Sequence, residues 1–320
     1  MTQPPAHREQ PAGPSVRYVC LPGSRFTGST LLGTLLNEHP ECASIGAATG
    51  LIRRTDLTTY RCSCGELFRE CGFWNQVAER TRALGHPVNV FETNFWNTHL
   101  KLSRNRAVNF ALARSLGWSP LNRARDALVS TMPSARARVA DMGWRTWSLA
   151  TAVLELTGKR VFVDTARDHQ RPKYLSRLPM FDLRVIHLVR DPRGNVASIM
   201  KHTGVDVATA ARQWQHVNVE AERVRPYLAP ERWLSLRYEA LCADPAGVLG
   251  RIADFLGVRR VPMEGFESAP RHIIGNKMRM KGVSEIREDL SWRTTLSASD
   301  LSTIARVAGR TSRSFGYAWP

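Results

Sequence analysis

A short glycine-bounded loop near the start of the sequence has the spacing of a phosphate-binding motif. Residues 23 to 30 read GSRFTGST, which fits the pattern G-x-x-x-x-G-x-[ST]. Glycines let backbone amides converge without side-chain clashes, and Thr27, Ser29 and Thr30 offer hydroxyls. A helix that begins near Ser29 would point its positive end at the same place. The loop is therefore predicted to bind an anion.

Ser29 stands where a nucleotide triphosphatase carries the lysine that reaches the β- and γ-phosphates. The sequence also offers no convincing carboxylate for Mg²⁺, so transfer of a γ-phosphate would lack its usual charge neutralisation. We expect a phosphate that is bound but not transferred. The alternative for the loop taken alone is a plain Gly/Ser turn between a strand and a helix.

A second pair of residues points to another phosphate. In HLVRDPRGNVASIMKH, Arg190 ends a predicted strand, and Ser198 follows eight residues later in the next helix. An arginine and a hydroxyl presented in this way can bind a separate phosphate, so one ligand with two anionic groups is predicted. A surface cluster of Arg190 with Asp191, with Ser198 merely solvated, is the alternative.

The two loops, PGSRFTGSTLL and VIHLVRDPRGNVAS, resemble the 5′-phosphosulfate and 3′-phosphate loops of sulfotransferases that use 3′-phosphoadenosine 5′-phosphosulfate (PAPS). The stretches HPECASIG, RCSCGELFRECGFW, VDTARD, LRYEALCADP and HIIGNKMRM are similar to the bacterial carbohydrate and small-molecule branch. The resemblance implies a three-layer P-loop-type α/β fold with a parallel sheet. It also implies transfer of a sulfuryl group from PAPS to a hydroxyl of a sugar, lipid or small-molecule acceptor.

The resemblance assigns roles to individual positions. The 5′-phosphosulfate would lie on Thr27, Gly28, Ser29 and Thr30, and the 3′-phosphate on Arg190 and Ser198. Tyr238 would contact the adenine, and Arg279, Lys281 and Gly282 would close over the 3′-phosphate. The family needs no metal for the transfer because basic side chains and amides stabilise the leaving bisphosphate.

The sequence departs from the family at two places. The family usually has a basic residue immediately before the S/T-G-[ST]-T segment, but Phe26 occupies that position here, so Arg25 is the candidate replacement. The glutamate that serves many relatives as general base is also missing, since Ala47 and Ala48 stand in its stretch.

A general base must lie within hydrogen-bond reach of the acceptor. The strand end VDTARDH offers Asp164, Asp168 or His169, and Arg167 lies nearby to orient the acceptor. Alternatives are that Asp164 caps a turn, that His169 is solvated, or that an acidic acceptor such as a phenol needs little base.

The elements that would position these residues alternate along the chain. Strands are expected within residues 16–21, 159–165, 183–192 and 232–241, and apolar helices follow residues 29, 191 and 244. This alternation favours a parallel sheet covered by helices on both faces, with ligands bound at the carboxyl edge. We expect a disordered arm over residues 1–15 and a single domain over 16–320, with a helical insertion at about 75–157.

The composition is that of a folded protein with an unusual charge. Hydrophobic residues make up 43% of the 320 residues, whereas the net charge is +17 and the isoelectric point is about 10.5. Such a surface attracts anions of several kinds. No apolar run has the length of a signal or membrane-spanning segment, so a cytoplasmic protein is expected.

Two further features leave alternatives open. Cys62, Cys64 and Cys71 lie close enough to share a metal or form one bridge, but they supply only three thiolates and no histidine lies at finger spacing, so no metal site is predicted. Residues 99–129 mix apolar and basic residues, which suits peripheral contact with anionic lipid or, as we favour, a core-facing helix.

We therefore expect a PAPS-dependent sulfotransferase that does not act on nucleic acid. A P-loop small-molecule kinase and a non-catalytic protein that binds nucleotides or nucleic acid are the rival hypotheses. The sequence does not identify the acceptor or the oligomeric state.

Overall fold

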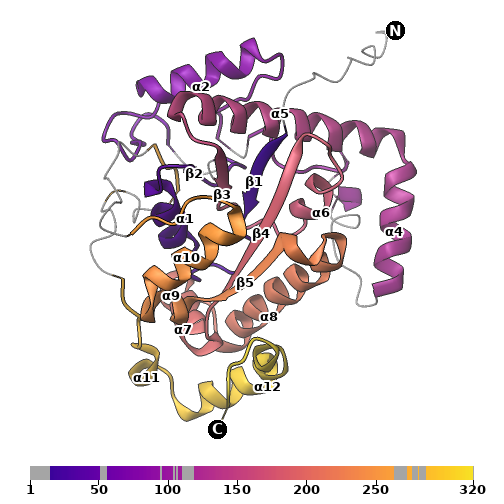
Figure 1. The fold of residues 1–320 in the computed structure, drawn as a ribbon. Coiled ribbons are helices and arrows are strands. Elements are labelled where there is room, and N and C mark those ends of the chain that lie inside the picture. Colours follow the sequence, from indigo (N-terminus) through magenta and orange to yellow (C-terminus); the bar gives the residue numbers. More distant parts are fainter. Residues whose placement is uncertain are drawn as a thin grey trace.

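The computed structural model describes residues 15–50, 56–93, 96–103, 105, 107–109, 119–262, 272–275, 280 and 286–319. Within these residues the centre of the molecule is a five-stranded parallel sheet with the strand order β2-β3-β1-β4-β5 (Figure 1). The parallel sheet expected from the sequence is confirmed. The strands are β1 (Val16–Cys20), β2 (Cys42–Gly46), β3 (Val161–Asp164), β4 (Phe181–Val189) and β5 (Trp233–Arg237).

The sheet is buried on both faces because side chains alternate along its strands. On β1, Tyr18 and Cys20 pack into one apolar cluster together with Phe162 of β3. Val19 and Leu21 point to the opposite cluster. The two clusters place one layer of helices on each side of the sheet, which is the predicted three-layer arrangement.

The helices of the first layer come from two widely separated parts of the sequence. They are α1 (Ser29–Glu38), α9 (Tyr238–Ala243) and α10 (Pro245–Leu256), whose leucines and valines pack on β1, β3 and β4.

The second layer contains α5 (Pro133–Thr157), which packs across β1, β2 and β3 and carries α2 (Gly72–Ala83) on its outer side (Figure 1). Together with α4 (Ser119–Thr131) these helices fall within or overlap the stretch expected to be a helical insertion. The short helix α6 (Arg171–Leu175) follows β3. The division into an arm and a single domain stays a prediction, and residues 1–14 of the arm lie outside the described residues.

A third apolar cluster lies at the carboxyl end of β4. It is built by α7 (Pro192–Thr203), α8 (Val207–Val224) and α12 (Ala298–Ser314), with Trp214 fully buried at its centre. Three short helices complete the described elements: η1 (Arg225–Tyr227), η2 (Pro230–Arg232) and α11 (Trp292–Thr295).

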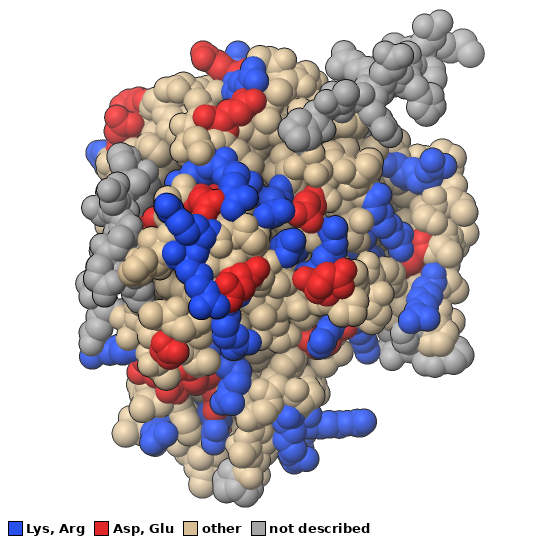
Figure 2. Space-filling model, viewed as in Figure 1, with Lys and Arg blue, Asp and Glu red and all other residues tan. Residues whose placement is uncertain are grey.

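Charged side chains are frequent on the face shown in Figure 2. Lys and Arg form a band across it, with Asp and Glu interspersed. Ion pairs join some of the charged side chains of the molecule: Asp182 accepts from Arg17 at 2.9 Å and lies 3.1 Å from Arg232. Among the helices that are described, none combines the length and apolarity that crossing a bilayer requires.

Candidate active site

Two loops leave neighbouring strands at the same edge of the sheet. The loop of residues 21–28 follows β1, and Arg190 and Asp191 follow β4, which pairs with β1 in parallel. The carboxyl ends of parallel strands meet at one edge, where ligands of open α/β folds bind. The two phosphate loops predicted from the sequence are therefore adjacent.

The amino terminus of α1 is open. Gly28 is its N-cap residue with φ 89°, and the described side chains provide neither a capping hydrogen bond nor an acidic group in the first turn. By contrast, Asp191, Asp206 and Asp244 accept hydrogen bonds from backbone amides at the starts of α7, α8 and α10. The first amides of a helix need partners from outside the helix, so the start of α1 presents a positive dipole end that suits an anion.

Buried hydrogen bonds fix the shape of the loop before α1. The Thr27 hydroxyl donates to the Ser24 carbonyl at 3.0 Å, and the Ser24 hydroxyl donates to Asn195 of α7 at 3.1 Å. Asn195 in turn donates to the Arg25 carbonyl at 2.7 Å. Thr27 therefore holds the loop from within, and Asn195, which the sequence analysis missed, ties the two phosphate loops together.

Arg190, Ser198 and the loop after β1 are in direct contact. The Arg190 guanidinium donates to the Phe26 carbonyl at 3.1 Å and to the Ser198 hydroxyl at 3.3 Å, although Arg190 is only 6% exposed. A glycine at position 194 makes room for it, since a Cβ there would lie 3.2 Å from two guanidinium nitrogens. This arrangement places a buried cation beside the open end of α1.

Tyr238 lies between the two loops. The Arg190 guanidinium carbon is 4.8 Å from the centre of the Tyr238 ring, and a Cβ added to Gly28 would lie 2.6 Å from a carbon of that ring. Burial raises the pKa of Tyr238 well above its ordinary value, so its hydroxyl stays protonated and donates to the Arg287 carbonyl at 3.2 Å. An aromatic ring therefore touches both loops.

The chain near residue 289 also reaches this cluster. Arg190 donates to the Asp289 carbonyl at 3.2 Å, and the Asp289 carboxylate lies 3.8 Å away. The positions Arg279, Lys281 and Gly282, which were expected to close over the 3′-phosphate, lie outside the described residues.

The backbone around Arg190 is held from three sides. Trp214 donates to the Arg190 carbonyl at 3.0 Å, and the Asp191 amide donates to Glu239 at 2.8 Å. Tyr317 donates to the other oxygen of Glu239 at 2.7 Å. These partners are not evident from the sequence because they come from two other helices, α8 and α9, and from the carboxyl-terminal residues.

Phe26, at the position where the family has a basic residue, is turned towards α7. Its φ is 62°, a left-handed conformation that is unusual for a bulky residue, and its ring stacks on His202 at 4.7 Å. Arg25 is exposed beside it. Desolvation first, and then repulsion from Arg25, lower the pKa of Arg167, so the two guanidinium groups lie within electrostatic reach of each other. The replacement of the usual basic residue by Arg25 stays a prediction.

Asp164 is buried at the end of β3 and has four hydrogen-bond donors. Tyr18 donates at 2.7 Å, Arg171 forms a short ion pair with the same oxygen, and the amides of Ala48 and Ala166 each donate at 2.8 Å to the other oxygen. The carboxylate is thus engaged with the protein on both oxygens. This geometry favours a structural role over proton transfer.

His169 has a ring nitrogen available. Its Nδ1 is buried and has no hydrogen-bond partner among the described residues, and its ring lies 5.9 Å from that of His216. Burial lowers the pKa of His169, so the neutral form that accepts a proton predominates at neutral pH. Asp168 accepts from the amides of Gln170 and Arg171 at 3.1 Å and caps the turn into α6.

His99 is a second histidine near this edge, and it was not identified from the sequence. It follows Thr98, whose hydroxyl donates to the Ala48 carbonyl at 2.6 Å just beyond β2. Burial lowers the pKa of His99, and the nearby Asp168 opposes this shift. No motif surrounds His99 in the sequence, so only the fold reveals its position.

Comparisons with known proteins find a likeness to sulfotransferases. Residues 121–262, a little under half of the chain, match the family model described as the sulfotransferase family. A search of curated protein sequences finds no match.

A solved structure extends the likeness beyond that segment. The sulfotransferase domain of a Synechococcus olefin synthase superposes over 100% of both chains with 21% identity and a TM-score of 0.52. The sulfotransferase domain from the curacin biosynthetic pathway covers 96% of this chain and 99% of its own, with 18% identity and a TM-score of 0.49. The superposition on the olefin synthase domain shows that the two chains share a fold. Residues 121–262 thus match the sulfotransferase family model, and the whole chain shares the fold of a sulfotransferase domain.

Proposed function

We propose that the protein transfers a sulfuryl group from PAPS to a hydroxyl of a sugar, lipid or small-molecule acceptor. One observation carries the proposal: Arg190, Ser198 and Tyr238 meet directly beside the uncapped start of α1. A nucleotide with phosphates at both its 5′ and 3′ positions needs two anion sites and an aromatic surface between them, and these residues offer all three.

On the donor side, PAPS supplies the sulfuryl group, and the loop after β1 holds the phosphate that remains behind. Gly28, Ser29 and Thr30 would contact that phosphate through the amides and hydroxyls of the first turn, while Thr27 keeps the loop in shape. Arg25 would neutralise the charge that develops on the leaving oxygen. In the part of the chain outside the described residues, Arg279, Lys281 and Gly282 would cover the 3′-phosphate.

On the acceptor side, His169 would act as the general base. The acceptor oxygen forms a bond to sulfur as the bond from sulfur to the 5′-phosphate oxygen breaks, and that oxygen keeps the electron pair. The proton of the acceptor hydroxyl passes to a ring nitrogen of His169. Asp164 would act through its contacts with Tyr18 and Arg171, which hold the strand end that carries His169.

Other aspects of the function stay predictions. The transfer is expected to need no metal, the location is expected to be cytoplasmic, and the acceptor is not nucleic acid. Contact with a membrane would involve α4, on which Leu121 and Leu128 are 48% and 62% exposed while Asn122 and Asp126 face the interior.

Thermal stabilisation by ligands tests the donor. We expect 3′-phosphoadenosine 5′-phosphate (PAP) to raise the unfolding temperature clearly more than AMP or ATP with Mg²⁺ does. In Arg190→Ala, PAP binding should weaken about 10- to 150-fold, because one charge-assisted contact contributes about 1.5–3 kcal/mol. Arg260→Ala is the matched control, since Arg260 is exposed and pairs with Asp254 far from the loops.

Three results would contradict the proposal. Equal stabilisation by PAP, AMP and ATP would show that the 3′-phosphate is not recognised. A requirement for ATP with Mg²⁺ would favour a kinase. Steeply salt-dependent binding to polynucleotide without preference for PAP would favour a nucleic-acid-binding protein.

A further inference from the structure

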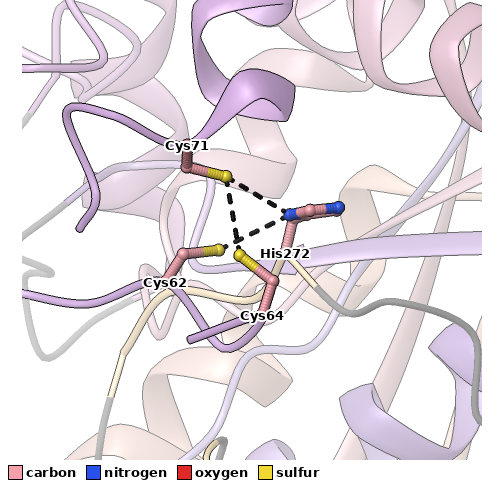
Figure 3. A group of neighbouring side chains, drawn as sticks. All are labelled: Cys62, Cys64, Cys71 and His272. Carbon is pink, nitrogen blue, oxygen red and sulfur yellow. Dashed lines mark hydrogen bonds between the residues drawn. The ribbon is translucent and has the colours of Figure 1, made fainter. Parts of the chain in front are cut away.

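Three cysteines and a distant histidine converge beside α2. Figure 3 shows the side chains of Cys62, Cys64, Cys71 and His272 pointing at a common centre. Their sulfur atoms and one imidazole nitrogen all lie within 4.8 Å of one another. Cys62 and Cys71 are fully buried, whereas Cys64 is exposed. His272 thus adds a fourth potential ligand to the three cysteines.

The distances agree with those of a tetrahedral zinc site. Bonds of about 2.3 Å to sulfur and about 2.0–2.1 Å to nitrogen place two sulfurs about 3.8 Å apart, and a sulfur and a nitrogen about 3.6 Å apart. The Sγ atoms of Cys64 and Cys71 are 3.7 Å apart. The Nδ1 atom of His272 lies 3.6 Å from the Cys62 sulfur and 3.5 Å from the Cys71 sulfur. These three ligand-to-ligand distances therefore already have the values of a tetrahedral zinc site.

The backbone around the cysteines is built to hold these positions. The Cys62 carbonyl accepts from the Gly65 amide at 3.0 Å, and the Cys62 amide donates to the Glu66 carbonyl at 2.9 Å, which closes a tight turn around Cys64. Cys71 is the N-cap residue of α2. The start of α2 therefore fixes the position of the Cys71 side chain.

The orientation of His272 is also fixed. Its ring stacks on Phe73 with the ring centres 4.2 Å apart and the planes 6° from parallel. The next residue, Ile273, donates its amide to the Ser63 hydroxyl at 2.8 Å. The imidazole is thereby held with Nδ1 facing the sulfurs.

We propose that Cys62, Cys64, Cys71 and His272 bind one Zn²⁺ ion in a structural site. Three thiolates and one imidazole in tetrahedral arrangement favour zinc over the hard cations, which prefer oxygen ligands. Four protein ligands leave no open coordination position for a substrate. The site is therefore distinct from the sulfuryl-transfer chemistry.

The metal would fasten one edge of the sheet. Residues 272–275 run along the end of β2, where the Ile274 amide donates to the Ile45 carbonyl at 2.8 Å. The Gly275 amide donates to the Tyr60 hydroxyl at 2.9 Å. Zinc would join this segment to the loop before α2, which lies about two hundred residues earlier in the chain.

Metal analysis of the full-length protein, purified without chelator, tests the site. We expect one zinc per chain by mass spectrometry, and none in His272→Ala. His272→Cys should keep the zinc, because a fourth thiolate completes the same tetrahedron. Cys242→Ser is the matched control, since Cys242 lies outside the cluster, and it should also keep one zinc per chain.

Cobalt gives a second measurement that does not depend on variants. Adding Co²⁺ to metal-free protein should give thiolate-to-cobalt charge transfer and the intense visible bands of a tetrahedral ion, and removal of metal should lower the unfolding temperature. A protein with neither zinc nor these bands would overturn the proposal. A mass lower by two hydrogens with a Cys64–Cys71 disulfide would also overturn it.

Discussion

The buried pair of Asp164 and Arg171 gives the sharpest test of the site. Asp164→Asn keeps the size of the side chain and an oxygen that can accept from the two backbone amides. It removes the negative charge that faces Arg171, and the side chains of the pair are only 2% and 1% exposed. The guanidinium then becomes a buried charge without its counter-ion.

The burial of the pair determines how much folding stability Asp164→Asn should lose. Breaking a buried ion pair by removing one partner costs about 3–5 kcal/mol. At about 2 °C per kcal/mol for a domain of this size, the unfolding temperature should fall by about 6–10 °C. Replacing both partners, as in Asp164→Asn with Arg171→Met, should recover part of this loss because no buried charge remains.

The control is the same substitution in an exposed pair. Asp254 and Arg260 are 52% and 68% exposed, so solvent screens their attraction. Asp254→Asn should lower the unfolding temperature by less than about 2 °C.

Two measurements separate a positioning role of Asp164 from a role as general base. They are calorimetry and single-turnover kinetics, the latter at a temperature where wild type and Asp164→Asn are both folded. If Asp164 is a positioning residue, Asp164→Asn loses stability but keeps turnover within about tenfold of wild type, since a missing general base costs about 100-fold or more. A variant with wild-type stability and a rate below that range would refute the reasoning and make Asp164 the base.

Three further predictions concern the donor and acceptor sides. His169→Ala should slow transfer about 10²- to 10⁴-fold. Because burial lowers the pKa of His169, wild-type activity should fall only below the ordinary value of about 6.5, and an unchanged acid limb in His169→Ala would contradict this. Gly28→Ala should weaken PAP binding about tenfold or more by calorimetry, since its φ of 89° is strained for alanine and the new Cβ would lie 2.6 Å from the Tyr238 ring. Asp289→Asn should tighten PAP binding by up to about fivefold, because it removes a half-exposed anion 3.8 Å from Arg190; weaker binding would contradict this.

Local signals in the sequence were sufficient for much of the fold. The strand, loop and helix of residues 16–38 and the strand and capped helix of residues 181–203 are each encoded by a continuous stretch of about twenty residues. β2 was missed because CASIG is short and made mainly of small residues, and only its pairing with β3 defines it as a strand. β2 can therefore be recognised as a strand only through β3, which lies more than a hundred residues later in the sequence.

The candidate site also contains some residues that the sequence predicts and others that only the fold reveals. Arg190, Ser198 and Tyr238 were predicted from motifs, and the fold brings them together. His272 was missed because the chain offers no spacing rule that connects it to Cys71, which lies 201 residues earlier. Asp164 was identified as a polar strand end, but its engagement with Tyr18 becomes visible only through the pairing of β1 and β3.

The adjacency of β1 and β4 has a consequence for how isomeric nucleotides are distinguished. Cys20, the last residue of β1, is paired with Val185, whereas β4 continues to Val189, so the two phosphate loops leave strands that lie about 4.8 Å apart at points staggered by four residues. The sheet thus sets a fixed distance that the loops alone would not maintain. A nucleotide with its second phosphate on the 2′ oxygen carries the same charge but a different span. Discrimination between the two isomers would therefore be a property of the rigid sheet, and it should persist when individual contacts in the loops are weakened.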